Sequence, residues 1–120
     1  MIKINNISKT FGDVKAVQNI NLEIKDGELF GLIGPDGAGK STLMRLMTTL
    51  YIPDCGSITM NGRDTVNDYK SIRRHVGYMP GRFSLYQDLS VEENLAFYAS
   101  VFGSTIEENY DLVKDVYEQI

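Results

Sequence analysis

Gly34-Pro35-Asp36-Gly37-Ala38-Gly39-Lys40-Ser41 is the stretch of the 120-residue chain that decides the fold. It matches the pattern G-x-x-x-x-G-K-[ST] at every fixed position. Glycines in such a loop let backbone N–H groups converge on an anion without side chains in the way. A helix that begins at the loop adds free N–H groups and the positive end of its dipole. The stretch therefore predicts a phosphate-binding loop, Walker A.

The polar residues of this stretch have separate expected tasks. Lys40 brings a mobile positive charge to the β- and γ-phosphates, Ser41 offers its hydroxyl to Mg²⁺, and Thr42 adds a donor to the α-phosphate. We therefore expect a nucleoside triphosphate, ATP with Mg²⁺. A carboxylate at Asp36 should repel phosphate unless it points away. The predicted nucleotide-binding positions of the loop are Gly34, Pro35, Asp36, Gly37, Ala38, Gly39, Lys40, Ser41 and Thr42.

The sequence around the loop supports this interpretation against a glycine-rich helix cap without a ligand. Residues 29–33 are apolar on both faces, which predicts a strand buried on both sides. After the loop, apolar residues recur at helical spacing over 41–50, which predicts an amphipathic helix. Alternating apolar residues over 2–5 and 20–25 predict half-buried, antiparallel strands near the N-terminus.

Further elements follow the loop and its helix. Short strands are expected at 57–60 and 76–79, the first closed by an Asn61-Gly62 turn, and a short helix at 68–74. Residues 80–88 are expected to form a loop. Two helices should then begin after Ser90 and Thr105, since each has a Glu three residues later, the spacing of a capping box.

Composition excludes several classes of function. The net charge is −4 and the basic residues are scattered, so a basic surface for nucleic acid is not expected. The single cysteine, Cys55, suits a reducing cytosol. No apolar run approaches the ~20 residues of a membrane span, and the N-terminus lacks the features of a signal peptide.

Taken in order along the whole chain, these segments resemble the nucleotide-binding domain of ABC transporters. The loop is shared by all P-loop proteins, whereas the ordered combination is specific to this family. Its form here, with Tyr78-Met79-Pro80 and 83–86, is most similar to bacterial export ATPases of the multidrug-efflux type. The other matching segments are Phe11-Gly12 with Ala16-Val17 (the adenine-stacking loop), 56–62 (a strand after the Walker helix), 76–80 (the lead-in to the Q-loop) and 88–95 (the opening of the helical subdomain).

The resemblance implies an α/β fold. It consists of a P-loop NTPase (RecA-like) core, an N-terminal antiparallel β subdomain and the start of an α-helical subdomain. Residues 1–89 would form the nucleotide-binding part and residues 90–120 the start of the helical subdomain. Because the last apolar stripe reaches Ile120 without a C-cap signal, we expect a truncated ABC ATPase domain; a frayed natural C-terminus is the alternative.

The resemblance also implies further binding residues and partners. Phe11 would stack on adenine and Val17 would lie near the base and ribose, although Phe11 could serve only in packing. Phe83, Leu85 and Tyr86 would contact a transmembrane permease subunit, unless they simply pack under the helical subdomain. A second ATP-binding domain, in the same chain or a dimer, would complete the assembly at the cytoplasmic face of the inner membrane.

Two departures from the family pattern bear on catalysis. Gly81 stands where the family has the Q-loop glutamine, which helps hold Mg²⁺ and the attacking water. The chain also ends before the signature motif, the Walker B carboxylate and the switch histidine, and His75 lies too early to be that histidine. We therefore expect an ATPase in the intact protein, no catalytic residue in these 120 residues, and weak or absent hydrolysis by them alone.

Two other classes of function remain open at this level. One is an ABC ATPase outside transport, ribosome-associated or for DNA repair, against which the absence of a basic patch argues. The other is a P-loop kinase for a small metabolite. Such kinases usually start near the strand before their loop, whereas about 30 strand-like residues precede it here.

Overall fold

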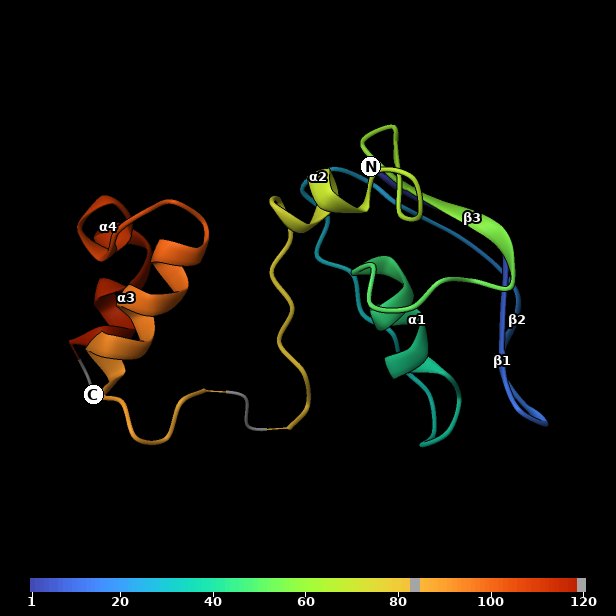
Figure 1. Ribbon diagram of the computed structural model, residues 1–120, viewed down its shortest axis with the longest axis horizontal. Coiled ribbons are helices and arrows are strands. Elements are labelled where there is room, and N and C mark those ends of the chain that lie inside the picture. The colour runs from blue at the N-terminus through green and yellow to red at the C-terminus, as the bar shows by residue number, and fades with distance from the viewer. Residues whose placement is uncertain (83–84, 119–120) are drawn as a thin grey trace. The chain divides into compact units, whose positions relative to one another are not determined.

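The computed structural model describes residues 1–82 and 85–118 and falls into two compact units, Met1–Tyr78 and Met79–Ile120. The first unit contains the strands with helices α1 and α2, and the second contains helices α3 and α4 (Figure 1). The expected division after residue 89 stays a prediction.

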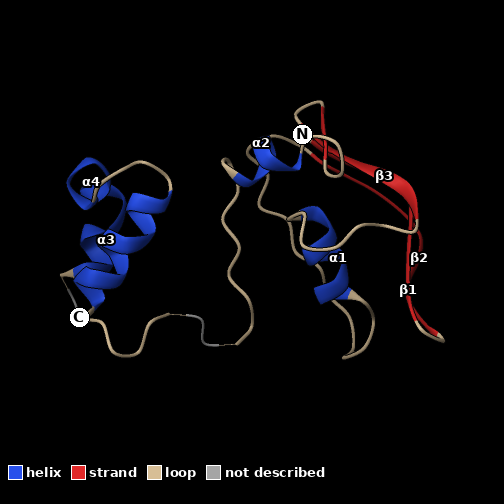
Figure 2. Cartoon of the chain, in the orientation of Figure 1, coloured by secondary structure: helices blue, strands red, loops and turns tan. Residues whose placement is uncertain are grey.

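The first unit is built on an antiparallel sheet (Figure 2). Its strand order is β2-β1-β3-β4, so β1 lies between two antiparallel neighbours. The expected N-terminal strands are thus confirmed. A turn at Asn61-Gly62 joins β3 to β4, and both residues have positive φ, 50° and 79°, as a tight hairpin turn requires. The strands are β1 (Ile2–Phe11), β2 (Val14–Ile24), β3 (Cys55–Met60) and β4 (Arg63–Asp64).

A bulge in β1 changes the simple alternation expected from the sequence. Ile4 and Ile7 are both buried although they are three residues apart. The pairing of β1 with β2 shifts register between them, and Asn6 takes a φ of 50°. The Asn21 side chain fills the irregularity, because its Oδ1 accepts from the Asn6 N–H at 2.9 Å and its Nδ2 donates to the Asn6 Oδ1 at 3.1 Å. The extra residue returns Ile7 to the core face.

Helix α1 (Lys40–Met47) covers the sheet and completes the core of the first unit (Figure 1). Its buried residues are those of the predicted apolar stripe, although the helix ends three residues before the expected Leu50. Full burial of side chains of this size contributes about 1.5–3 kcal/mol each. The core consists of Ile4, Ile7, Val17, Leu43, Leu46, Met47 and Ile58. A short helix α2 (Tyr69–Arg73) follows the sheet, as predicted.

The second unit is a pair of helices, α3 (Val91–Val101) and α4 (Ile106–Tyr117). Both predicted N-caps are confirmed. The Ser90 hydroxyl accepts from the Glu93 N–H at 3.1 Å, and the Thr105 hydroxyl accepts from the Glu108 N–H at 3.2 Å. The apolar faces of the two helices line a shared cavity of about 330 Å³.

Two predicted strands do not form. Residues 29–33 and 76–79 have no helix or strand. Leu29 and Ile33 are fully exposed, where burial on both faces was expected. A strand needs hydrogen-bonded neighbours, and among the described residues the sheet holds only β1 to β4. The apolar pattern therefore indicates that the segment suits a buried environment. It does not form a strand without neighbouring strands to pair with.

Candidate functional site

The phosphate-binding loop has the backbone shape that its glycines predict. Gly37 and Gly39 have φ values of 84° and 91°, a region that favours glycine. Gly39 is the N-cap of α1, and its carbonyl accepts from the Leu43 N–H at 2.9 Å. The first-turn N–H groups of α1 therefore begin directly at the loop, as an anion site at a helix N-terminus requires.

Gly39 is also the point where the loop meets the sheet. A Cβ atom at this position would lie 2.3 Å from the Ala16 carbonyl oxygen and 2.7 Å from Val17 Cγ1. Such distances are shorter than van der Waals contact, so only glycine allows this approach. Contact with β2 thus fixes the position of the loop relative to the β1–β2 turn.

A cavity of about 350 Å³ opens between the loop and the β1–β2 turn. Its size is within the range of small-molecule sites. The cavity brings Phe11, 41% exposed, to the same site as the loop at 34–41, although the two are far apart in sequence. The lining residues are Phe11, Val14, Lys15, Ala16, Asp36, Gly37, Gly39, Lys40, Ser41 and Thr42.

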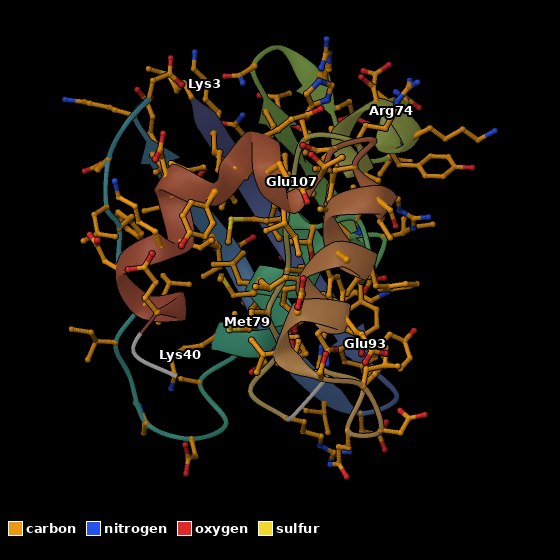
Figure 3. The ribbon with its side chains drawn as sticks, turned by 90° about the vertical axis from the view of Figure 1, so that its left-hand side faces the viewer. Lys3, Lys40, Arg74, Met79, Glu93 and Glu107 are labelled. Carbon is orange, nitrogen blue, oxygen red and sulfur yellow. The ribbon has the colours of Figure 1, made fainter. Side chains whose placement is uncertain are left out.

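Lys40 lies at the start of α1 and is labelled in Figure 3. Its ammonium group donates to the carbonyl oxygens of Gly34 and Pro35, the latter at 2.7 Å. The Lys40 ammonium group, which is expected to bind phosphate, is therefore hydrogen-bonded to the first two residues of the loop. The Asp36 side chain is exposed and also lines the cavity, so a carboxylate stands at this site.

The remaining predicted positions lie around the cavity without lining it. Gly34, Pro35 and Ala38 belong to the loop backbone, which a bond of 3.2 Å from the Ala38 N–H to the Pro35 carbonyl tightens. Val17 is buried in the core, 6% exposed, and packs beneath Gly39. In this arrangement Val17 supports the loop.

Three lining residues, Val14, Lys15 and Ala16, were not predicted to bind the nucleotide, although Ala16 lies in the segment that resembles the adenine-stacking loop. Lys15 adds a second positive charge to the lining, beside that of Lys40. Their position between Phe11 and Val17, both predicted to bind the nucleotide, was the signal in the sequence that could have identified them.

Phe11 is anchored as well as accessible. Its ring meets that of Tyr51 edge to face, with centroids 5.2 Å apart. The Lys9 ammonium lies 5.3 Å from the Phe11 ring centroid. The guanidinium of Arg45 lies 5.8 Å from the Tyr51 ring centroid. Packing and a ligand contact are therefore compatible, because one edge of the ring can pack while part of its surface faces the cavity.

Asp54 ties down the end of β1 just before Phe11. Its Oδ2 accepts from the Thr10 N–H at 2.7 Å, and its Oδ1 lies 3.3 Å from Lys9 Nζ. The bond from the Thr10 N–H is the largest cause that holds the pKa of Asp54 below its ordinary value; burial opposes it, and the hydrogen bond and charge of Lys9 lower the pKa further. The carboxylate thus fixes the strand end that carries Phe11.

Replacing Asp54 with asparagine is expected to lower the melting temperature most near neutral pH. A carboxylate whose pKa is lower in the folded state stabilises that state above its unfolded pKa of about 3.9, and this contribution disappears as the pH falls through the folded value. The difference between wild type and Asp54→Asn should therefore shrink from pH 7 toward pH 3, as measured by circular dichroism. Asp13→Asn, at an exposed carboxylate in the β1–β2 turn, serves as the control. A difference that does not change with pH would contradict this account.

The second unit holds the residues expected to contact a membrane partner. Phe83 lies outside the described residues. Leu85 and Tyr86 are about half exposed, and Gly81 lies in an irregular, exposed segment. Tyr86 packs edge to face on Phe97 of α3, with ring centroids 5.1 Å apart. This contact holds the Tyr86 ring against α3 and leaves about half of the residue accessible.

The cavity residues fit a magnesium nucleotide. No group of three or more His, Cys, Asp or Glu side chains among residues 1–82 and 85–118 could hold a metal ion. Mg²⁺ that is bound to a nucleotide takes most of its ligands from phosphate oxygens and water. It then needs only one ligand from the protein, such as the Ser41 hydroxyl. None of the helices in the same ranges has the length and the apolar character of a membrane span.

Comparison with known proteins agrees with this geometry. The sequence pattern of the ABC transporter family matches residues 17–120. The probable multidrug ABC transporter ATP-binding protein YbhF of Escherichia coli (strain K12) is 43% identical over 103 residues, which cover 86% of this chain and 18% of that protein. The sulfate/thiosulfate import ATP-binding protein CysA of Synechocystis sp. is 44% identical over 97 residues, which cover 80% of this chain and 27% of that protein.

Solved structures give the same result. An ATP-binding subunit of an ABC transporter superposes with a TM-score of 0.78 at 29% identity and covers 89% of this chain and 45% of that one. The ATP-binding cassette MJ0796, in a dimer bound to ADP and Pi, superposes with a TM-score of 0.75 at 30% identity and covers 85% of this chain and 48% of that one. The chain spans less than half the length of these relatives, and its fold is that of part of an ABC ATPase domain. The chain belongs to the ABC transporter family.

Proposed function

We propose that the cavity beside the loop binds Mg-ATP. The observation that carries the proposal is the convergence of Lys40, Ser41 and Phe11 on one cavity, from α1 and from the end of β1. Lys40 supplies the charge for the β- and γ-phosphates, Ser41 a ligand for Mg²⁺, and Phe11 a surface on which adenine can stack. The cavity lining contains two lysines, Lys15 and Lys40, and one carboxylate, Asp36, so it does not form the broad basic surface that nucleic acid requires.

Titration of the chain with ATP in the presence of Mg²⁺, followed by calorimetry, tests this proposal. We expect saturable binding at one site that weakens when EDTA removes Mg²⁺. Phe11→Ala should reduce the affinity for ATP and leave inorganic triphosphate binding unchanged, because only the base contacts that ring. Absence of ATP binding by the folded chain would refute the proposal.

For the intact protein we propose an ATPase that drives a membrane permease subunit, with a second ATP-binding domain completing the assembly. The name of YbhF and the dimeric state of MJ0796 support this proposal. Positioning and charge stabilisation account for most phosphoryl-transfer catalysis. This chain supplies the charged groups, and Gly81 offers no side chain for the attacking water. These 120 residues are therefore expected to bind ATP with weak or absent turnover, at the cytoplasmic face of the membrane.

We favour multidrug export over import as the direction of transport. The preference rests on Tyr78-Met79-Pro80 and residues 83–86, whose sequence is most similar to export ATPases, and on the match to YbhF. Importers match as well, since CysA proteins are 44% identical over 80% of the chain and 39% identical over 99% of it. Transport assays with the intact protein in inverted membrane vesicles decide between them. ATP-dependent uptake of a dye into inverted vesicles corresponds to export from the cell, whereas sulfate accumulation in whole cells would replace this assignment with import.

A further inference from the structure

Asn94 is the residue that α3 buries, at 7% exposure, although the helix also carries large apolar side chains. A buried amide is costly unless its hydrogen bonds are satisfied. It lies in the first turn of α3, next to Glu93, which Figure 3 labels. The position calls for an explanation, because the apolar face of α3 was expected to supply the buried residues.

The Asn94 amide is fully engaged with the chain that precedes α3. Its Oδ1 accepts from the Tyr86 N–H at 2.9 Å, and its Nδ2 donates to the Tyr86 carbonyl at 3.0 Å. The same Nδ2 lies 3.3 Å from the Leu89 carbonyl and 2.9 Å from the Ser90 carbonyl. One side chain thus pairs with both main-chain groups of Tyr86, as a neighbouring strand would, and closes residues 86–90 onto the helix.

The start of α4 provides a comparison for the start of α3. Ser90-Val91-Glu92-Glu93-Asn94 and Thr105-Ile106-Glu107-Glu108-Asn109 have the same pattern at the starts of α3 and α4. Asn109 Nδ2 donates to the Thr105 carbonyl at 2.9 Å, just as Asn94 Nδ2 donates to that of Ser90. Asn109 Nδ2 also donates to the Ser104 hydroxyl, next to its own N-cap, at 2.7 Å. The contact with a distant residue is therefore a property of Asn94 and not of the pattern.

We infer that Asn94 is a positioning residue that locks the segment 85–89 to α3 and so sets how Leu85 and Tyr86 are presented. The Tyr86 ring packs on Phe97 while its main chain is held by Asn94, so two independent contacts fix this residue. The link to a membrane subunit rests on the proposed function. The link between Asn94 and Tyr86 does not.

Amide hydrogen exchange measured by NMR on the chain tests the inference. In Asn94→Ala the Tyr86 amide should exchange at least about tenfold faster, since it loses its acceptor, while the amides of residues 98–101 stay unchanged. Asn109→Ala should leave the Tyr86 amide as it is in the wild type. Unchanged exchange at Tyr86 in Asn94→Ala would overturn the inference.

Asn94→Gln provides a second test in case Asn94→Ala unfolds α3. Glutamine keeps the amide on an arm one methylene longer and favours helix, so α3 should persist while the paired contact to Tyr86 is lost. Faster Tyr86 exchange with intact α3 supports the inference, and wild-type exchange overturns it. ATP affinity should change less than twofold in all three variants, because none of these residues lines the nucleotide cavity.

The functional consequence is tested in the assembled transporter in liposomes. Asn94→Ala should lower the ratio of ATP turnover by the transporter to that by its isolated ATP-binding protein, and Asn109→Ala should not. Equal ratios would overturn the presentation role. A protein that turns over no ATP in either form would refute the proposed function and leave the exchange result as the test of Asn94.

Discussion

Replacing Lys40 with alanine is expected to lower the affinity for Mg-ATP about a hundredfold, the effect of losing charge-assisted bonds of about 1.5–3 kcal/mol. Lys40 is the basic residue of the loop itself and is one of the residues that line the cavity. No other side chain of the loop carries a positive charge, so the variant leaves Asp36 as its only charged group. Calorimetric titration of both proteins with ATP and Mg²⁺ measures the difference.

The size of this effect also depends on what Lys40 does in the loop. Its bonds to the Gly34 and Pro35 carbonyls must be exchanged for bonds to phosphate on binding. Lys40→Arg keeps the charge but spreads it over a planar group, so we expect an intermediate loss. Lys25→Ala, at an exposed lysine outside the cavity, is the matched control and should bind as the wild type does. Equal affinity of Lys40→Ala and wild type would contradict the assignment of the cavity.

Local chemistry made the loop and the helix starts predictable from the sequence. Gly39 and Gly37 adopt left-handed conformations, and Ser90 and Thr105 cap the helices that follow them. For the two caps the partner lies three residues away, so a short pattern contains the interaction that determines the structure, and the left-handed turn at Gly37 is equally local. Gly39 also approaches Ala16 and Val17 of β2, a contact that the pattern does not contain.

Long-range contacts could not be predicted in the same way. Residues 29–33 carry the pattern of a buried strand, yet a strand forms only with a hydrogen-bonded neighbour, and among the described residues none pairs with them. The bulge at Asn6 depends on the Asn21 side chain, 15 residues away. The burial of Asn94 could not be predicted either, because its side-chain amide bonds to the main chain of Tyr86 in a loop that has no repeating sequence pattern.

The candidate site shows the same division. The residues predicted to bind phosphate lie within one continuous stretch. Six of them line the cavity, namely Asp36, Gly37, Gly39, Lys40, Ser41 and Thr42, whereas Gly34, Pro35 and Ala38 do not. The other wall comes from the end of β1 and the start of β2, where the family resemblance suggested Phe11 and the structure adds Val14, Lys15 and Ala16. Val17, expected near the base, is instead buried beneath Gly39. Contacts across the sheet decide which residues of this turn face the cavity.

Gly39→Ala is expected to be the most damaging single-methyl substitution in the loop. A non-glycine residue at a φ of 91° costs about 1–2 kcal/mol in strain. The new Cβ would also lie 2.3 Å from the Ala16 carbonyl oxygen, so the loop must move away from β2. We expect a loss of at least about 3 kcal/mol in unfolding free energy, measured by urea denaturation without nucleotide, and a large loss of Mg-ATP affinity.

Gly37→Ala separates the two causes of this effect. Gly37 has nearly the same φ, 84°, but nothing lies within 4 Å of a Cβ built there. Its alanine variant should therefore show the backbone strain alone, about 1–2 kcal/mol. The difference between the two variants then measures the close approach of the loop to Ala16 and Val17. Equal destabilisation would show that backbone conformation alone requires glycine, and that contact with β2 does not hold the loop in place.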